Sequence, residues 1–309
     1  MKDTIIDAVI PVFKPGIELR ELIRRLEQQK AKIRHIYIMH TEDGCELERF
    51  EFFKEYDNIS IEEIGVEDFD HGGTRDRGIS LSDAEYVLCM TQDAVPTDAF
   101  VTEKLLEGMR DEKVAIAYAR QIPKRDCHLI ERYIRNFNYP GKSMIKSKKD
   151  LERLGIKTYF CSNVCALYRK EIYKEQGGFE KKIIISEDMI YAAGCIQNGY
   201  KVAYMADAKV IHSHNYTNAQ QFHRNFDIAV AQVQHPDIFE GVKSESEGVR
   251  MVKQTALYLM RSRHPLSIIT LFWSSAAKYL GYFMGKHYRC LPRKIVLKCT
   301  MSPRYWDRL

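Results

Sequence analysis

Short apolar runs alternate with amphipathic segments through the first 120 residues of this chain. The run "TIIDAVIPVF" predicts a buried strand that ends at Pro11, and "GIELRELIRRLEQQ" places its apolar residues on one helix face. Further strands are predicted at "RHIYIMH", "NISIEEI", "EYVLCM" and "KVAIAYA", with helices at "CELERFEFFKEY" and near residues 100–109. Strands that alternate with helices predict an α/β fold with a mostly parallel sheet and helices on both faces.

The pattern changes in the second half of the chain. "SNVCALYR" predicts another strand, and "SEDMIYAAGCIQNG" a helix with Ser186 as N-cap and Gly199 at its end. "KVAYMADAKVIHSH" predicts two short strands around a turn, and only helical patterns follow residue 216. We therefore expect one domain over residues 1–220 and a helical appendage over 221–309.

The composition is that of a globular protein, with 45% hydrophobic and 29% charged residues. The N-terminal stretch does not resemble a signal peptide, because acidic residues interrupt its short apolar run. The eight cysteines include no C-x-x-C pair, and several lie within apolar runs. Buried free thiols are typical of a reducing compartment, so the cytoplasm is the expected location.

The net charge of +5 is unevenly distributed. From Arg261 to the end there are ten basic residues and one acidic residue, whereas the preceding part has 37 basic and 41 acidic residues. The basic character therefore belongs to the C-terminal region and requires an explanation specific to that region.

Three polar stretches, "HTEDG", "HGGTR" and "TQDA", follow predicted strands, and parallel sheets bind ligands at the carboxyl ends of their strands. Asp93 follows the apolar strand "YVLCM" directly. A carboxylate in that place can hold a divalent cation that bridges a diphosphate. The alternative is that Asp93 caps the next turn.

Residues 71–78, "HGGTRDRG", have the composition of a loop that leads into a helix. Gly72 and Gly73 permit positive φ, and Thr74 is a suitable N-cap. A helix N-terminus carrying Arg75 favours an anion. The stretch is neither a Walker A motif nor G-x-G-x-x-G, and a solvated helix start is the alternative.

Two further stretches carry titratable residues. "SED" (186–188) has the usual composition of a helix first turn, but Asp188 beside the apolar "IIIS" could act as a general base. In "VIHSH", alternation would place His212 and His214 on one strand face. Such a pair can contact a metal or a phosphate, or can be two buried structural histidines.

The order of "PVFKPG", "HTEDG", "HGGTRDRG", "TQDAVP", "SED" and "HSH" resembles the family 2 inverting glycosyltransferases of the GT-A fold. Within that family it is most similar to bacterial rhamnosyltransferases that use dTDP-L-rhamnose. The resemblance covers about residues 5–230, and the combination of "HGGTR" with "TQDA" is its specific part.

The resemblance implies a nucleotide-sugar half over residues 1–120 and an acceptor and base half over 121–220. It implies that the nucleotide sugar is bound by Pro11, Val12, Thr41, Glu42, Asp43, His71, Gly72, Gly73, Arg75 and Gln92. It also implies Mn²⁺ or Mg²⁺ at Asp93, with His212 or His214 as further contacts, and Asp188 as the catalytic base. Thr91 stands where the family's D-x-D motif has its first carboxylate, so only one Asp is available. Arg75, Asp93 and Asp188 are expected to converge on one pocket.

The implied partners are a dTDP-L-rhamnose donor and a saccharide acceptor linked to polyprenyl diphosphate, as in the assembly of cell-surface polysaccharides. The same fold with a UDP-sugar donor is the nearer alternative. A non-catalytic protein that binds lipid or nucleic acid through its basic tail is the alternative from another class. Nucleic-acid binding is not expected, because residues 1–260 are net acidic.

Residues 265–285, "PLSIITLFWSSAAKYLGYFMG", are nearly long enough to cross a bilayer, but Lys278 lies well inside the segment. Ser267, Thr270, Ser274 and Lys278 recur at helical spacing opposite the large apolar residues. Together with the basic residues that follow, this predicts an element over 265–300 that lies on a membrane surface. The protein would then be peripheral on the inner face of the cell membrane. A docked helix, a homo-oligomer contact and a true span are the alternatives.

Overall fold

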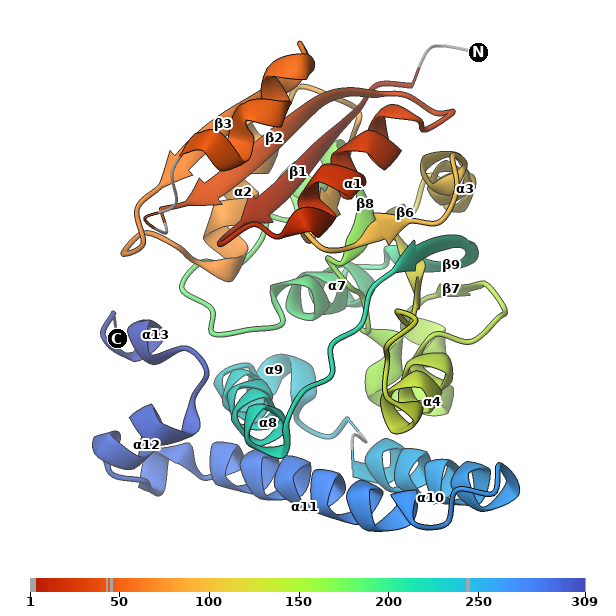
Figure 1. Cartoon of the computed structure of the whole chain (residues 1–309), viewed down its shortest axis with the longest axis vertical. Helices are drawn as coiled ribbons and strands as arrows, with labels where there is room; N and C mark the ends of the chain where they lie inside the picture. The colour runs from red at the N-terminus through yellow and green to blue at the C-terminus, as the bar shows by residue number, and fades with distance from the viewer. Residues whose placement is uncertain (1–3, 43, 45–46, 243–244, 309) are drawn as a thin grey trace.

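The computed structural model describes residues 4–42, 44, 47–242 and 245–308. Its strands are β1 (Ile6–Val12), β2 (Ile33–Thr41), β3 (Ile59–Ile64), β4 (Tyr86–Met90), β5 (Val95–Pro96), β6 (Val114–Ile122), β7 (Met144–Lys146), β8 (Cys165–Arg169) and β9 (Lys201–Ile211). They form one sheet in the order β3-β2-β1-β4-β8-β6-β9-β5, with β7 paired to β9 (Figure 1). Strands β3, β2, β1 and β4 are parallel, whereas β8 is antiparallel to both of its neighbours. The predicted α/β fold with a mostly parallel sheet is confirmed.

Helices cover both faces of the sheet and continue beyond it. The α-helices are α1 (Ile17–Glu27), α2 (His71–Leu81), α3 (Val101–Gly108), α4 (Leu129–Asn138), α5 (Leu151–Leu154), α6 (Lys170–Glu175), α7 (Glu187–Gln197), α8 (Asn218–Gln234), α9 (Pro236–Phe239), α10 (Glu245–Arg261), α11 (Ser267–Lys286), α12 (Arg293–Cys299) and α13 (Pro303–Trp306). Short 3₁₀ helices are η1 (Leu47–Glu55), η2 (Lys148–Asp150), η3 (Gly155–Thr158) and η4 (Tyr288–Cys290).

The two faces of the sheet have separate cores because successive strand residues point to opposite sides. Ile10 is buried with α1 and α3, whose Leu22 and Leu105 lie in the same cluster. Val9 is buried on the other face with α2 and α7, through residues such as Ile79. Burying each such side chain contributes about 1.5–3 kcal/mol. The two cores hold the strand ends rigidly in place.

Two predicted elements differ in detail. The segment predicted as a helix at "CELERFEFFKEY" is the 3₁₀ helix η1. The two short strands predicted in residues 201–214 are the single strand β9. Its pairing with β6 jumps from Ala119 opposite Met205 to Arg120 opposite Lys209, so the expected turn is a bulge within a continuous strand.

Helix α11 packs against α8 in the helical layer that follows the sheet (Figure 1). A Cβ atom on Gly281 would lie 2.2 Å from the carbonyl oxygen of Phe222, and one on Gly285 would lie 2.3 Å from that of Phe226. Only glycine allows the two helix backbones to approach so closely. From Asn218 onward the described residues form helices and no strand, as the pattern predicts.

Candidate active site

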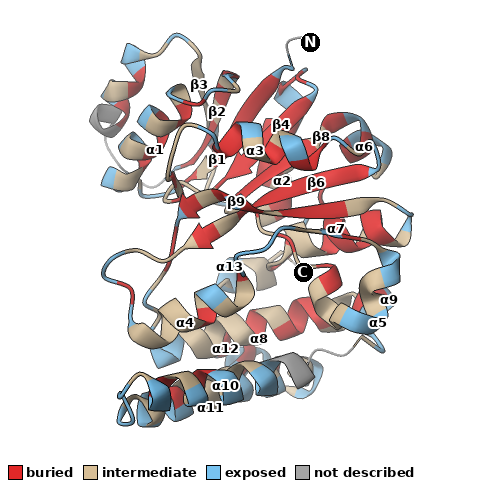
Figure 2. Ribbon diagram, turned by 90° about the vertical axis from the view of Figure 1, so that its right-hand side faces the viewer, coloured by how far each residue is buried: buried red, intermediate tan, exposed pale blue. Residues whose placement is uncertain are grey.

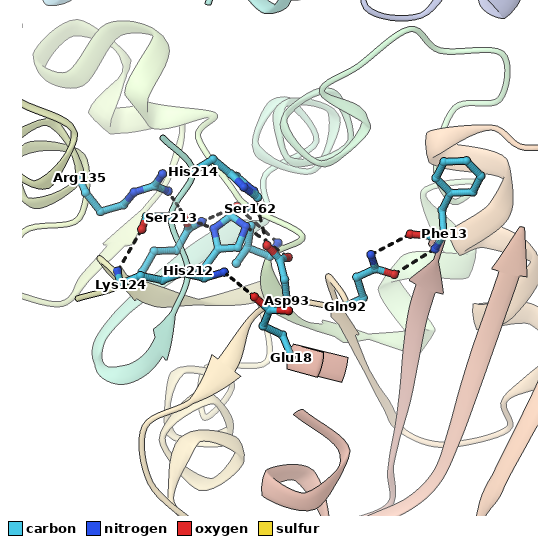
Figure 3. Close-up of polar contacts among 12 residues, drawn as sticks. Phe13, Glu18, Gln92, Asp93, Lys124, Arg135, Ser162, His212, Ser213 and His214 are labelled. Carbon is cyan, nitrogen blue, oxygen red and sulfur yellow. Dashed lines mark hydrogen bonds and ion pairs between the residues drawn. The ribbon is translucent and has the colours of Figure 1, made fainter. Parts of the chain in front are cut away.

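The turn after β4 and the end of β9 bring a carboxylate and two imidazoles together (Figure 3). Because β5 pairs with β9, Val95 lies opposite Ile211, and the residues just outside this pair become neighbours. The carboxylate oxygens of Asp93 lie 3.5 Å from Nε2 of His212 and 3.5 Å from Nε2 of His214. The two histidines lie beyond β9, so the predicted shared strand face is instead a loop that directs both rings toward Asp93.

The donor set of Asp93, His212 and His214 fits a divalent cation. One ligand atom from each residue lies within 4.8 Å of the others. Burial lowers the pKa of His212 well below the ordinary histidine value and also lowers that of His214, which keeps both rings neutral and able to act as ligands. Nδ1 of His212 lies 3.0 Å from Oε1 of Gln121, which leaves Nε2 directed toward Asp93. The Thr91 hydroxyl, at the position of the missing carboxylate, is buried without a hydrogen-bond partner among the described residues.

Helix α7 begins with two carboxyl groups whose pKa values are shifted in opposite directions. Burial, reinforced by the charge of Glu187, raises the pKa of Asp188 to about 7. Burial acts in the same sense on Glu187, but Arg75 and His71 outweigh it and hold the pKa of Glu187 below its ordinary value. Nη1 of Arg75 lies 3.0 Å from Oε1 of Glu187. A carboxyl with a pKa near neutrality is suited to general base catalysis, while its partner stays ionised.

Two adjacent residues before β8 connect this acid pair to the Asp93 cluster. The backbone N–H of Asn163 donates to Asp188 at 2.9 Å, and its side-chain amide donates to the other carboxylate of the pair at 3.0 Å. The hydroxyl of Ser162 accepts from the side-chain amide of Gln121 at 2.9 Å, and Gln121 also contacts His212. Asp188 and the histidine cluster are therefore linked through Asn163 and Ser162, two neighbours in the chain that each bond to one of them or to its partner.

The "HGGTRDRG" stretch forms the first turns of α2 and is not a loop. The helix begins at His71 with Asp70 as its N-cap, so the expected cap at Thr74 is wrong. Neither glycine of the pair has a positive φ. Gly72 is required by packing instead, because a Cβ there would lie 2.0 Å from the carbonyl oxygen of Glu180.

Arg75 points toward the start of α7 and is only 6% exposed. Its guanidinium donates to the carbonyl oxygen of His71 at 2.9 Å and pairs with Glu187. Arg75 is therefore placed to keep Glu187 ionised beside Asp188. A direct contact between Arg75 and a phosphate stays a prediction.

A cavity of about 460 Å³ opens at the carboxyl ends of β1 and β2. Phe13 and Thr41 line it from the sheet, and His71 lines it from the start of α2. The loop 182–184 and the C-terminal segment 301–308 complete its walls. Its position at the strand ends, and its size, are those of a small-molecule site in an α/β protein.

Gln92 connects this cavity to the Asp93 cluster. Its side-chain amide accepts from the backbone N–H of Phe13 at 3.0 Å and donates to the carbonyl oxygen of Phe13 at 2.9 Å (Figure 3). Gln92 thus braces the end of β1 against the turn that carries Asp93.

The remaining predicted nucleotide-binding residues lie near the cavity in different ways. Thr41 lines it and is buried. The Val12 side chain is 1% exposed and lies in the hydrophobic core, because strand alternation turns it away from the cavity. Pro11 is partly exposed and Glu42 is exposed. Neither of these two residues lines the cavity. Asp43 lies outside the described residues.

Gln121, Asn163 and Glu187 hold the network together, yet the sequence did not single them out as site residues. Gln121 lies near the end of a buried strand, where a polar residue is a recognisable signal. Glu187 is a residue type common in the first turn of a helix. Its contact with Arg75, which the sequence does not show, distinguishes it from an ordinary first-turn residue.

Comparisons with known proteins bear on the family of this chain. Residues 7–177 match the family model for glycosyl transferase family 2. The chain is 37% identical to the O-antigen chain rhamnosyltransferase RfbN of Salmonella typhimurium (strain LT2), over 98% of this chain and 96% of that protein. It is 40% identical to the O-antigen chain rhamnosyltransferase WbaN of Salmonella anatum, over 80% of this chain and 78% of that protein.

Two solved structures share its architecture. The mannosyltransferase PcManGT from Pyrobaculum calidifontis, in complex with GDP-Man and Mn²⁺, matches with a TM-score of 0.56 and 11% identity, over 98% of this chain and 88% of that chain. S. aureus TarS 1–349 matches with a TM-score of 0.53 and 13% identity, over 93% of this chain and 92% of that chain. The chain therefore belongs to glycosyl transferase family 2 and has the GT-A fold.

Proposed function

We propose that this protein transfers L-rhamnose from dTDP-L-rhamnose to a sugar hydroxyl of a lipid-linked O-antigen-type polysaccharide precursor, with inversion of configuration. Two relatives at 37% and 40% identity are named O-antigen chain rhamnosyltransferases, which supports the transferred sugar. The observation that carries the mechanism is the opposite pKa shift of Asp188 and Glu187 within a network that reaches the Asp93 cluster.

In this mechanism ionised Asp188 accepts the proton of the acceptor hydroxyl, whose oxygen forms the new bond to the anomeric carbon. The bond between that carbon and the diphosphate breaks, and its electron pair leaves with dTDP. Attack opposite the leaving group converts a β-linked donor into an α-rhamnoside without a covalent enzyme intermediate. Arg75 keeps Glu187 ionised. Burial, and after it the charge of Glu187, raises the pKa of Asp188 to about 7.

Asp93, His212 and His214 would hold the divalent cation, with Gln121 orienting the His212 ring. A cation bound there supplies positive charge where the departing diphosphate becomes more negative. Gln92 ties the turn that carries Asp93 to Phe13 at the cavity wall, which favours a nucleotide lying along this edge of the sheet.

A thermal-shift titration tests the donor nucleotide. We expect dTDP with Mn²⁺ to stabilise the protein most, and UDP and GDP with Mn²⁺ to stabilise it less. At a hundredfold excess over Kd, binding adds about 2.7 kcal/mol to the free energy of unfolding, which raises Tm by several degrees. A larger shift with UDP than with dTDP would replace the proposed donor with a UDP-sugar, and transfer assays with both donors would then decide.

The same proposal places the protein on a membrane surface through α11. The buried residues of this helix are Leu271, Gly281 and Gly285, and Lys278 is partly buried beside them, whereas Thr270 of the predicted polar side is exposed. Burial lowers the pKa of Lys278. The large apolar side chains face outward, since Phe272 is 62% and Trp273 60% exposed. Figure 2 shows exposed positions along α11, at the edge of the molecule.

The outward apolar strip, defined here as Ile269, Phe272, Trp273, Leu280 and Phe283, is bracketed by positive charge. Each of its members is at least half exposed. Exposed arginines precede α11 at positions 261 and 263 and follow it at positions 289 and 293. An apolar strip between basic residues suits the boundary between acyl chains and anionic headgroups. No helix in the described ranges is long and apolar enough to span a membrane.

The double variant Phe272→Glu/Trp273→Glu is expected to lose binding to vesicles that contain one-third phosphatidylglycerol, by at least about tenfold in a sedimentation assay. The matched control is Phe100→Glu, because Phe100 is also exposed but lies beside α3, away from the strip. Equal binding of the double variant and the control would contradict this part of the proposal. So would a wild-type protein that binds no vesicles and forms a dimer that the double variant loses.

A further inference from the structure

The C-terminal segment Met301–Arg308 turns back from the helical layer toward the sheet (Figure 1). It forms one wall of the cavity at the ends of β1 and β2. Met301, Ser302, Pro303, Arg304, Tyr305 and Arg308 all line this cavity. No resemblance or motif assigned this segment to the nucleotide side of the protein, because it lies far from residues 1–120 in the sequence.

Both ends of the segment are anchored. At its start, the Thr300 hydroxyl donates to Asp227 of α8 at 2.6 Å, and the Met301 N–H donates to the same carboxylate at 2.9 Å. Asp227 is 2% exposed. At its end, the guanidinium of Arg308 donates to the carbonyl oxygens of Phe69, at 2.6 Å, Val66 and Glu67, all in the loop between β3 and α2. The segment therefore connects α8 to the strand ends.

In the middle of the segment, one arginine is available to bind an anion. The Tyr305 hydroxyl donates to Gln234 at 3.0 Å, and Asp307 pairs with Arg293 at 2.9 Å. Arg304 lines the cavity and is exposed. Within residues 4–42, 44, 47–242 and 245–308, no acidic residue forms an ion pair with it.

The cavity has an excess of positive charge. Lys182 and Arg304 line it with exposed side chains. Among the described residues, Asp70 is the one acidic residue of the lining. Its carboxylate already accepts from the backbone N–H groups of Gly73, in the first turn of α2, and of Ile183, at 3.1 Å. A cavity of this size with two available cations suits a small anion-bearing ligand better than a macromolecule.

We propose that the C-terminal segment is part of the donor site, where Arg304 contacts the phosphates of the nucleotide and the segment closes the cavity over the nucleoside. The proposal rests on the proposed function and adds a specific residue and wall to its donor site. It also means that donor binding is coupled to the layer formed by α8 and α12, because the segment is held there by Asp227 and continues directly from α12.

Calorimetric titration of the full-length protein with dTDP in the presence of Mn²⁺ tests the role of Arg304. Arg304→Ala is expected to weaken dTDP binding about tenfold, which corresponds to the loss of one charge-assisted contact. Lys294→Ala is the matched control: it removes the same charge from an exposed residue of the same tail, outside the cavity. The control should bind dTDP as the wild type does.

Hydrogen exchange provides a second measurement, made on the C-terminal segment itself. Backbone amide exchange in residues 300–308 is expected to slow when dTDP is added to the wild-type protein. Unchanged exchange, together with equal dTDP affinities of Arg304→Ala and Lys294→Ala, would overturn the inference and leave the proposed function intact. If the wild type bound no nucleotide at all, the proposed function would fail, and this inference with it.

Discussion

Replacing Asp188 with Asn is expected to reduce sugar transfer by about 10²–10⁴-fold, the range that a general base contributes. Asn keeps the size of the side chain but cannot accept the proton of the acceptor hydroxyl. Binding of dTDP should be unchanged, because Asp188 is linked to the Asp93 cluster indirectly, through Asn163, Ser162 and Gln121. Initial rates with saturating donor, measured beside a dTDP titration, separate the two quantities.

The wild-type pH profile gives an independent signature of the same group. Only the ionised form of Asp188 can accept a proton, and burial raises its pKa to about 7. The transfer rate should therefore be nearly constant above that pH and fall about tenfold for each pH unit below it. The exposed Asp207 supplies the matched control, Asp207→Asn, which should keep both the rate and the profile. Near-normal transfer by Asp188→Asn would remove this residue from the base role.

Replacing Asp93 with Ala is expected to abolish the response of transfer to Mn²⁺. The cluster would lose its carboxylate, and its two remaining imidazoles are neutral because their pKa values are lowered. Replacing residues that merely support a metal ligand costs about 10–100-fold in metal affinity, so loss of a ligand should cost at least as much. Titration with Mn²⁺, followed by calorimetry or by the rate, measures this affinity.

Asp207→Ala is the control for the Asp93 variant, since it removes an exposed carboxylate elsewhere on β9. Gln121→Ala provides a graded test, because Gln121 contacts His212 without belonging to the cluster. Its metal affinity should lie between those of the wild type and the Asp93 variant. An unchanged metal response in Asp93→Ala would show that transfer does not use this cluster.

The local pattern of apolar and polar residues was enough to predict the strands of the sheet and the strand ends near which the candidate site residues lie. Strand residues such as Ile10 and Leu88 form apolar runs that end at the edge where Asp93 lies. The approach of His212 and His214 to Asp93 follows from the pairing of β5 with β9, which periodicity cannot give. The sequence therefore identified these residues separately, and the sheet register brought them together.

Other features depend on contacts that leave no local signal. Thr74 is a residue type that often caps helices, but Asp70 holds that position. Its carboxylate accepts from the backbone N–H of Gly73, and it also accepts from that of Ile183. Periodicity defined the two sides of α11, yet it could not show that the side with Lys278 faces the protein. The close approach that Gly281 and Gly285 permit decides this orientation. The cavity wall at 301–308 lies in a short segment, and its single helical turn, α13, is too short to show a periodic pattern in the sequence.

We propose that two parts of one site have separate roles. The Asp93 cluster holds the donor diphosphate, and Asp188 accepts the proton of the acceptor hydroxyl. Calorimetric titration of wild type, Asp188→Asn and Asp93→Ala with dTDP and Mn²⁺ tests this claim most directly. We expect equal dTDP affinity for wild type and Asp188→Asn, and at least tenfold weaker affinity for Asp93→Ala. Equal affinity in all three proteins, or a loss in Asp188→Asn alone, would contradict it.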